Sequence, residues 1–377
     1  MTDTESIRAP APDLDAVLAR LEPCRPRMEV GRIRLPLREP FRISDHVFHD
    51  VETIEVRLES DGHVGVGEAA GVFYLGDDPE RMTRTLDEAQ DWIRNGLDHN
   101  ILTARMPAGG ARNALDCALW DLQARRAGAP VWQLLGMPQP RPLLTTFTVG
   151  SASPAAMAEK ALAYTQARAI KIKLIGDGDD ADRIFAIRAA QPDAWLGVDA
   201  NRSLTAETLQ QLMPALIASG VQLIEQPFPV GRDAQLASLD LPIPVAADES
   251  IQIAADIYRL APFYRVVNIK LDKCGGLTEA LRMIARARTL GLEAMVGNMI
   301  GSSLAMAPAY LVGQFCSIVD LDGPVFLTAD RTPGVEYCDG LIHVPEAVWG
   351  GRRSHEEQVR RRRQKQTVGV RFRLPNP

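Results

Sequence analysis

Six short apolar segments each end in a carboxylate or a lysine: AIKIKL (169–174), WLGVDAN (195–201), VQLIEQP (221–227), PVAADES (244–250), VVNIKLD (266–272) and SIVDLDG (317–323). The first five of these charged ends follow one another at steps of about 22 to 26 residues. A strand, a turn, a helix and a second turn use roughly that length in a βαβ unit. Since buried parallel strands read as continuous apolar runs, the pattern predicts parallel strands with their charged ends on one rim.

Two further segments complete the series. LEAMVGN (292–298) fills the wider gap before the last strand, and TTFTVG (145–150) precedes the first one. Residues 154–167, 180–190 and 277–291 carry apolar side chains at the three-and-four spacing of helices. We therefore expect a (β/α)7β TIM-like barrel with its chemistry at the C-terminal ends of the strands. An open doubly wound sheet would explain the alternation, but not a charge at the end of every strand.

The remaining sequence predicts a second domain, because 377 residues exceed one barrel. Residues 28–60 look like strands of a meander and residues 79–127 look helical, which indicates an α+β N-terminal capping domain. We expect the chain to divide into an N-terminal extension (1–27), a capping domain (28–140, completed by about 325–350), the catalytic barrel (141–324) and a basic, solvated or disordered tail (351–377).

Composition excludes several classes of protein. A formal net charge of −6 does not favour a nucleic-acid partner. No apolar run reaches the roughly 18 residues that cross a bilayer, and the polar, acidic N-terminus does not resemble a secretory signal. The five cysteines are scattered without a CxxC pair, which favours reduced thiols in the cytoplasm. A homo-oligomer stays open.

Three carboxylates predict a metal site. Asp199, Glu225 and Asp248 lie at the ends of three successive strands, so we expect them to converge. Unpaired carboxylates in a small volume repel one another, and oxygen ligands favour Mg²⁺, or Mn²⁺ as a substitute, over zinc. The simpler alternative is that each one caps a helix or pairs with a lysine. Glu249 beside Asp248 is either a ligand or, as we prefer, a residue that supports the ligands.

Two lysines flank the carboxylate strands. Lys173 and Lys270 would then lie on opposite sides of the metal, where neighbouring positive charge lowers the pKa of an ammonium towards general-base use. Two bases facing each other across a substrate invert a stereocentre by removing a proton from one face and returning one to the other. Lys171 shares a face with Lys173, and we expect it to tune Lys173 or to contact a substrate carboxylate. The role of Lys273 stays open.

These motifs carry a family resemblance. KIK (171–173), DAN (199–201), EQP (225–227), ADES (247–250) and NIKLDKCGG (268–276) resemble the enolase superfamily in its muconate-lactonising subgroup. The resemblance extends from PLREPF (36–41) through NALDCALWDL to GVEY (334–337). It implies Mg²⁺ at Asp199, Glu225 and Asp248, acid–base lysines at Lys173 and Lys270, and an enolate intermediate.

The last strand indicates a substrate class. In VDLDGP (319–324), alternation would place Asp320 and Asp322 on one face of the strand, opposite the metal, where they would bind a cation such as a free α-ammonium. This pair is similar to that of dipeptide epimerases of the L-Ala-D/L-Glu type. The resemblance therefore implies a dipeptide substrate that is epimerised at the Cα of its C-terminal residue.

The sequence also departs from that pattern. Asn298 stands where these enzymes often carry cysteine, and we include it among the substrate-binding residues. The loop RISDHVFHD (42–50) lacks the arginine that follows the Pro-Phe pair in epimerases of Ala-Glu, so the identity of the dipeptide stays open. The alternatives are an N-acylamino acid racemase, an o-succinylbenzoate synthase or cycloisomerase-type lyase, and a barrel that binds without turnover.

Overall fold

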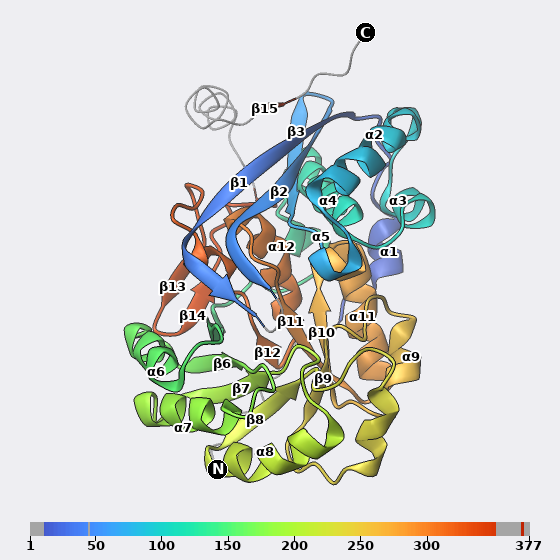
Figure 1. Ribbon diagram of the computed structural model, residues 1–377. Helices are drawn as coiled ribbons and strands as arrows, with labels where there is room; N and C mark the ends of the chain where they lie inside the picture. The colour runs from blue at the N-terminus through green and yellow to red at the C-terminus, as the bar shows by residue number, and fades with distance from the viewer. Residues whose placement is uncertain (1–10, 44–45, 352–370, 373–377) are drawn as a thin grey trace.

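The computed structural model describes residues 11–43, 46–351 and 371–372. Figure 1 shows a capping domain, in blue and cyan, above a barrel that runs from green to orange. The loops of the cap face the C-terminal ends of the barrel strands. This arrangement confirms the predicted (β/α)7β barrel with an α+β cap.

The barrel is one sheet of eight parallel strands in the order β12-β11-β10-β9-β8-β7-β6-β5. The amide of Thr146 donates to the carbonyl of Val319 at 3.0 Å and so joins the two end strands. The strands are β5 (Phe147–Val149), β6 (Ala169–Lys173), β7 (Trp195–Asp199), β8 (Val221–Glu225), β9 (Val245–Ala247), β10 (Val266–Lys270), β11 (Glu293–Gly297) and β12 (Ile318–Val319).

Helices connect these strands and cover the outside of the barrel. N-cap residues stabilise the first turn of two of these helices: Ser153 caps α6 (Pro154–Ala163) and Thr205 caps α8 (Ala206–Ala218), each by accepting a hydrogen bond from a backbone amide. Between β8 and β9 there is only the 3-10 helix η2 (Asp233–Ser238). The α-helices between the other strands are α6 (Pro154–Ala163), α7 (Asp180–Ala190), α8 (Ala206–Ala218), α9 (Asp256–Leu260), α10 (Leu271–Cys274), α11 (Leu277–Thr289) and α12 (Ser303–Gly313).

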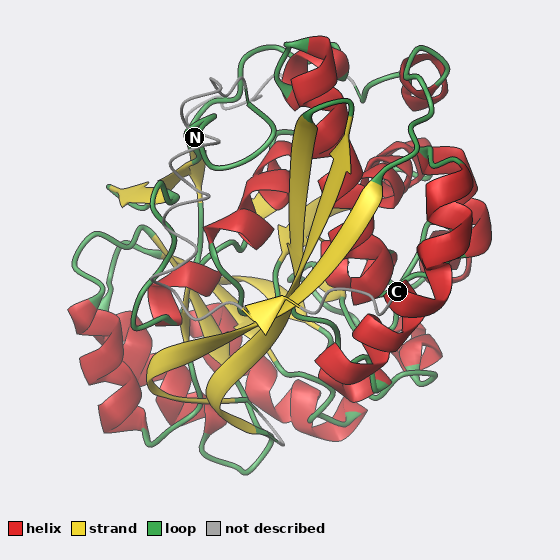
Figure 2. Ribbon diagram, turned by 90° about the horizontal axis from the view of Figure 1, so that it is seen from above, coloured by secondary structure: helices red, strands yellow, loops and turns green. Residues whose placement is uncertain are grey.

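The cap is an antiparallel meander packed on helices. Its strands β1 (Arg27–Arg42), β2 (Val47–Ser60) and β3 (His63–Ala69) pair in that order, and in Figure 2 they cross the middle of the molecule with helices around them. Three helices follow: α2 (Pro79–Asn95), α3 (His99–Arg105) and α4 (Gly110–Ala127). Gly65 and Gly67 let β3 approach α4, because a Cβ at either would lie within 2.2 Å of a backbone oxygen of that helix.

Helix α4 belongs to both domains and is buried along almost its whole length. Its Trp120 and Cys117 pack in the barrel core, whereas Leu115 and Leu119 pack with the cap. The burial of α4 is therefore not confined to one face of the helix. Asp116 accepts hydrogen bonds from the amide and hydroxyl of Thr278 on α11, which fixes the cap against the barrel.

The segments outside the two domains are short. Helix α1 (Leu14–Leu18) packs on the barrel. Strand β14 (Leu341–His343) pairs with β13 (Glu336–Cys338) on one side and with β4 (Leu143–Leu144) on the other, so these strands form a sheet separate from the cap meander. The boundaries of the domains stay a prediction. Of the basic tail (351–377), the structure describes Gly351 and β15 (Arg371–Phe372), which lies beside β1; the rest lies outside the described residues. No helix in the described part of the chain is long and apolar enough to cross a membrane.

Candidate active site

The site lies where five neighbouring barrel strands end. Lys173, Asp199 and Glu225 are the last residues of β6, β7 and β8, and they are aligned with one another in the sheet. Asp248 follows the last residue of β9, and Lys270 ends β10. Since the strands are parallel and in register, an even spacing in sequence becomes one cluster in space.

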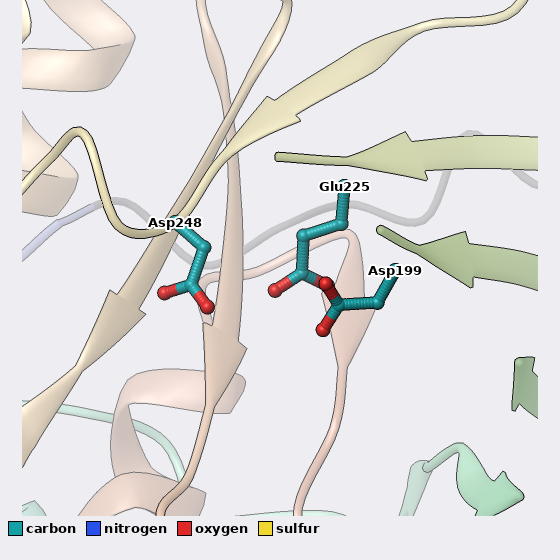
Figure 3. A group of neighbouring side chains, drawn as sticks. All are labelled: Asp199, Glu225 and Asp248. Carbon is teal, nitrogen blue, oxygen red and sulfur yellow. The ribbon is translucent and has the colours of Figure 1, made fainter. Parts of the chain in front are cut away.

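The three carboxylates converge as predicted. Asp199, Glu225 and Asp248 are buried, and each offers an oxygen within 4.8 Å of the other two (Figure 3). Burial raises the pKa of Glu225 to about 8, and the charge of Asp199 adds to this effect. Burial also acts on Asp199, but Lys173 and Lys171 lower its pKa more, to about 2. A set of three buried carboxylates this close together fits a hard divalent cation, because positive charge relieves their mutual repulsion.

Lys173 and Lys270 flank this cluster. The ammonium of Lys173 lies 2.6 Å from Oδ2 of Asp199, and that of Lys270 lies 2.8 Å from Oδ2 of Asp248. Burial lowers the pKa of Lys270, but Asp248 and other carboxylates raise it by more, so that it lies above its ordinary value. The pKa lowering that we expected from the sequence is therefore not seen at Lys270, because carboxylates surround it more closely than lysines do.

Lys171 lies beneath the cluster, where it binds three carboxylates. Its Nζ is 2.8 Å from Glu225, 2.8 Å from Asp320 and 3.1 Å from Asp199. Burial opposes its charge, but these carboxylates raise the pKa of Lys171 well above its ordinary value. Lys171 is a fixed counter-charge for the candidate metal ligands in this structure.

Asp320 and Asp322 are placed differently from the expectation. Strand β12 ends at Val319, so neither residue belongs to a strand. Both side chains contact the neighbouring strand β5 or the residue just before it. Asp320 pairs with Lys171 and accepts a hydrogen bond from the hydroxyl of Thr146, while Asp322 accepts one from the amide of Thr148 at 2.6 Å. Burial and the charge of Asp320 raise the pKa of Asp322 to about 6.

Several supporting residues were not assigned from the sequence. Asn268 donates to Oε1 of Glu225 at 2.7 Å, and Lys273 contacts both the carbonyl and the carboxylate of Asp248. Asn201 accepts from Lys173 and donates to Glu249 at 3.3 Å. Asn268 stands two residues before Lys270, so strand alternation could have placed both on the inner face. Glu249 contacts Asn201 and Arg202 and lines the cavity, and its role stays a prediction.

A cavity of about 230 Å³ opens above the cluster, between barrel and cap. Lys173, Lys270 and Asp248 line its floor, and Asn298 lines one side while donating to the carbonyl of Asp320 at 2.6 Å. The cap contributes an apolar wall that includes Phe48. Among the described residues, the lining does not include Asp320, Asp322 or Lys171.

Both domains match known protein families. Residues 28–136 match the mandelate racemase/muconate lactonizing enzyme N-terminal domain, and residues 154–350 match the enolase C-terminal domain-like family. The chain is 38% identical to the L-Ala-D/L-Glu epimerase of Escherichia coli (strain K12), over 82% of this chain and 97% of that protein. It is 42% identical to an N-acetyl-D-glutamate racemase of a Pseudoalteromonas species, over 69% of this chain and 82% of that protein.

Solved structures agree with these relatives. An enolase family member from Agrobacterium tumefaciens with homology to dipeptide epimerases, solved with sodium and L-Ala-L-Glu, superposes with a TM-score of 0.83 at 38% identity, covering 86% of this chain and 99% of that one. The dipeptide epimerase of Methylococcus capsulatus, solved with Mg and L-Arg-D-Lys, gives 0.77 at 32% identity over 85% and 96%. The chain therefore belongs, with these epimerases and racemases, to the mandelate racemase/muconate lactonizing enzyme family of the enolase superfamily, and it is an isomerase.

Proposed function

We propose that this protein is a dipeptide epimerase that inverts the Cα of the C-terminal residue by proton transfer between Lys173 and Lys270. The observation that carries the proposal is the placement of these two lysines on β6 and β10, on either side of three carboxylate strands and on the floor of one cavity. The dipeptide epimerases among the relatives and solved structures support the substrate class.

In the proposed reaction, one lysine in its neutral form removes the α-proton and leaves an enolate of the substrate carboxylate. The other lysine, as an ammonium, returns a proton to the opposite face. Asp199 holds the Nζ of Lys173 and Asp248 holds the Nζ of Lys270, so both amino groups are positioned before substrate binds.

Asp199, Glu225 and Asp248 would hold the divalent cation, for which we propose Mg²⁺. When bound, the cation supplies a Lewis acid that stabilises the negative charge developing on the substrate carboxylate. Asn268 and Lys273 keep the oxygens of Glu225 and Asp248 in place for this role.

An N-acylamino acid racemase is the second candidate, and two observations favour it. Asp320 is already neutralised by Lys171, and the lining of the cavity within the described chain leaves out both Asp320 and Asp322. In addition, the most identical of the relatives named above is an N-acetyl-D-glutamate racemase. The dipeptide proposal requires the substrate ammonium to reach Asp322, whereas the racemase proposal does not.

The two candidates are separated by a comparison of dipeptides with their N-acetyl forms in D2O, with α-deuteration read by mass spectrometry. For the dipeptide proposal we expect kcat/KM to fall about ten- to hundredfold on acetylation or in Asp322→Asn, since a hydrogen bond to a charged group contributes roughly 1.5–3 kcal/mol. A preference for the acetylated substrate, unaffected in Asp322→Asn, would favour the racemase.

The same assay tests the two lysines. Lys173→Ala and Lys270→Ala should each abolish inversion, while the remaining lysine exchanges the α-proton of one isomer only. Lys160→Ala serves as the control, because this lysine lies on α6 in an exposed pair with Glu39. Normal inversion by Lys270→Ala would exclude the two-base mechanism.

A further inference from the structure

Tyr74 has a polar group that the fold does not use. Its hydroxyl oxygen is shielded from solvent and has no hydrogen-bond partner among the described residues. A buried hydroxyl without a partner costs free energy, so folded proteins rarely retain one without a further role. Tyr74 lines the cavity together with Lys270 and Asp248, although it comes from the cap.

The segment that carries Tyr74 is attached to the barrel and the cap at both ends. Tyr74 lies in the short 3-10 helix η1 (Phe73–Leu75), which follows β3. Before it, the amides of Ala70 and Gly71 both donate to Oδ1 of Asp272 at 2.9 Å, only two residues beyond Lys270. After it, Asp77 accepts from the amide of Gly110 at 2.6 Å. These hydrogen bonds on both sides of η1 therefore fix the position of Tyr74 relative to Lys270.

The ring is also held on its face and at its edge. The guanidinium of Arg202 lies 5.2 Å from the ring centre, and Phe73 meets the ring edge-on at 5.3 Å. Burial, followed by the charges of Asp248 and Glu249, raises the pKa of Tyr74, so the phenol keeps its proton and acts as a donor. These contacts orient the ring, and no described residue accepts a hydrogen bond from its O–H.

We infer that the Tyr74 hydroxyl donates a hydrogen bond to the α-carboxylate of the bound substrate. For Lys270 to reach the α-proton, the α-carbon must lie at the floor of the cavity, and the carboxylate is one bond away from it. This inference rests on the proposed reaction at this site, but it does not depend on which substrate is used, because dipeptides and N-acylamino acids both carry the carboxylate. Tyr74 is then a catalytic residue that the cap adds to the barrel.

The test is Tyr74→Phe, which removes the hydroxyl alone, with Tyr258→Phe as the control because Tyr258 is exposed on α9. Kinetics are measured on whichever substrate the wild type turns over, the dipeptide or its N-acetyl form. The comparison of Tyr74→Phe with the wild type therefore holds even if the dipeptide proposal is wrong. We expect kcat/KM of Tyr74→Phe to fall about ten- to hundredfold, and that of the control to stay unchanged.

Thermal unfolding separates this role from a structural one. Removing a buried hydroxyl without a partner should leave the Tm of Tyr74→Phe unchanged or raise it. A kcat/KM equal to that of the wild type would overturn the inference. A Tm that falls together with activity would assign Tyr74 to packing and also overturn it.

Discussion

At the residue scale, Glu225 shows how the fold prepares a carboxylate for a cation. Its oxygens contact Lys171 and Asn268, yet burial raises its pKa from 4.5 to about 8, with Asp199 adding to the effect. Because this pKa is raised, a proton and a cation compete for the same carboxyl group near neutral pH. Without a cation, this raised pKa lowers the stability of the folded protein as the pH increases from about 4.5 to 8.

We predict that Mg²⁺ binding at pH 7 releases about one proton, and that Mg²⁺ raises the Tm more at pH 8 than at pH 6. The measurement is calorimetric titration of Mg²⁺ in buffers with different heats of ionisation. Glu225→Gln should abolish the proton release and weaken binding, whereas Glu336→Gln, at an exposed position, should change neither. A heat of binding that is the same in all buffers would show that Glu225 is already ionised.

At the element scale, the first residues of β2 and the 3-10 helix η1 line the upper part of the cavity. Phe48 and Phe73 meet edge-on at 5.4 Å, and His46 contacts both rings. Two carboxylates on the cap side of the cavity lining are already engaged, since Asp50 pairs with Arg34 and Asp77 accepts from Gly110. Among its described residues, this wall offers apolar side chains and carboxylates to the cavity, and no lysine or arginine that would pair with a negatively charged side chain.

We predict that a dipeptide with an apolar C-terminal residue is preferred over Ala-Glu by at least about tenfold in kcat/KM, because an acidic side chain at the cap wall loses hydration beside aromatic rings and carboxylates. Phe48→Arg should shift this ratio toward Ala-Glu by about tenfold. Phe185→Arg, at an exposed position on α7, is the control for the added charge. The interpretation is wrong if wild-type protein prefers Ala-Glu.

At the scale of the whole molecule, Arg331 joins the two domains. Its guanidinium lies 2.8 Å from Glu55 on β2 and 2.7 Å from Glu68 on β3. It also donates to the hydroxyl of Ser302, which caps α12 and donates in turn to Glu68. The buried carboxylate of Glu68 thus links the cap sheet to the loop that follows Asn298.

We predict that Arg331→Met lowers the free energy of unfolding by about 3 kcal/mol, because it leaves buried carboxylates without their counter-charge. Adding Glu68→Gln should recover part of the loss. Arg34→Met, which removes an exposed pair with Asp50, should leave the free energy of unfolding nearly unchanged. Urea unfolding measures all three variants; equal effects of Arg331→Met and Arg34→Met would show that the junction is not held by this arginine.

The sequence by itself determined the barrel, the convergence of Asp199, Glu225 and Asp248, and the flanking positions of Lys173 and Lys270. It could do so because strand alternation and the length of a βα unit are local properties that map directly onto one rim. Only the tertiary structure decided that Lys171 neutralises Asp320, that the pKa of Lys270 is raised, and that Tyr74 reaches the cavity. Those features depend on burial and on charges contributed by residues distant in the chain, which a pattern read along the sequence does not contain.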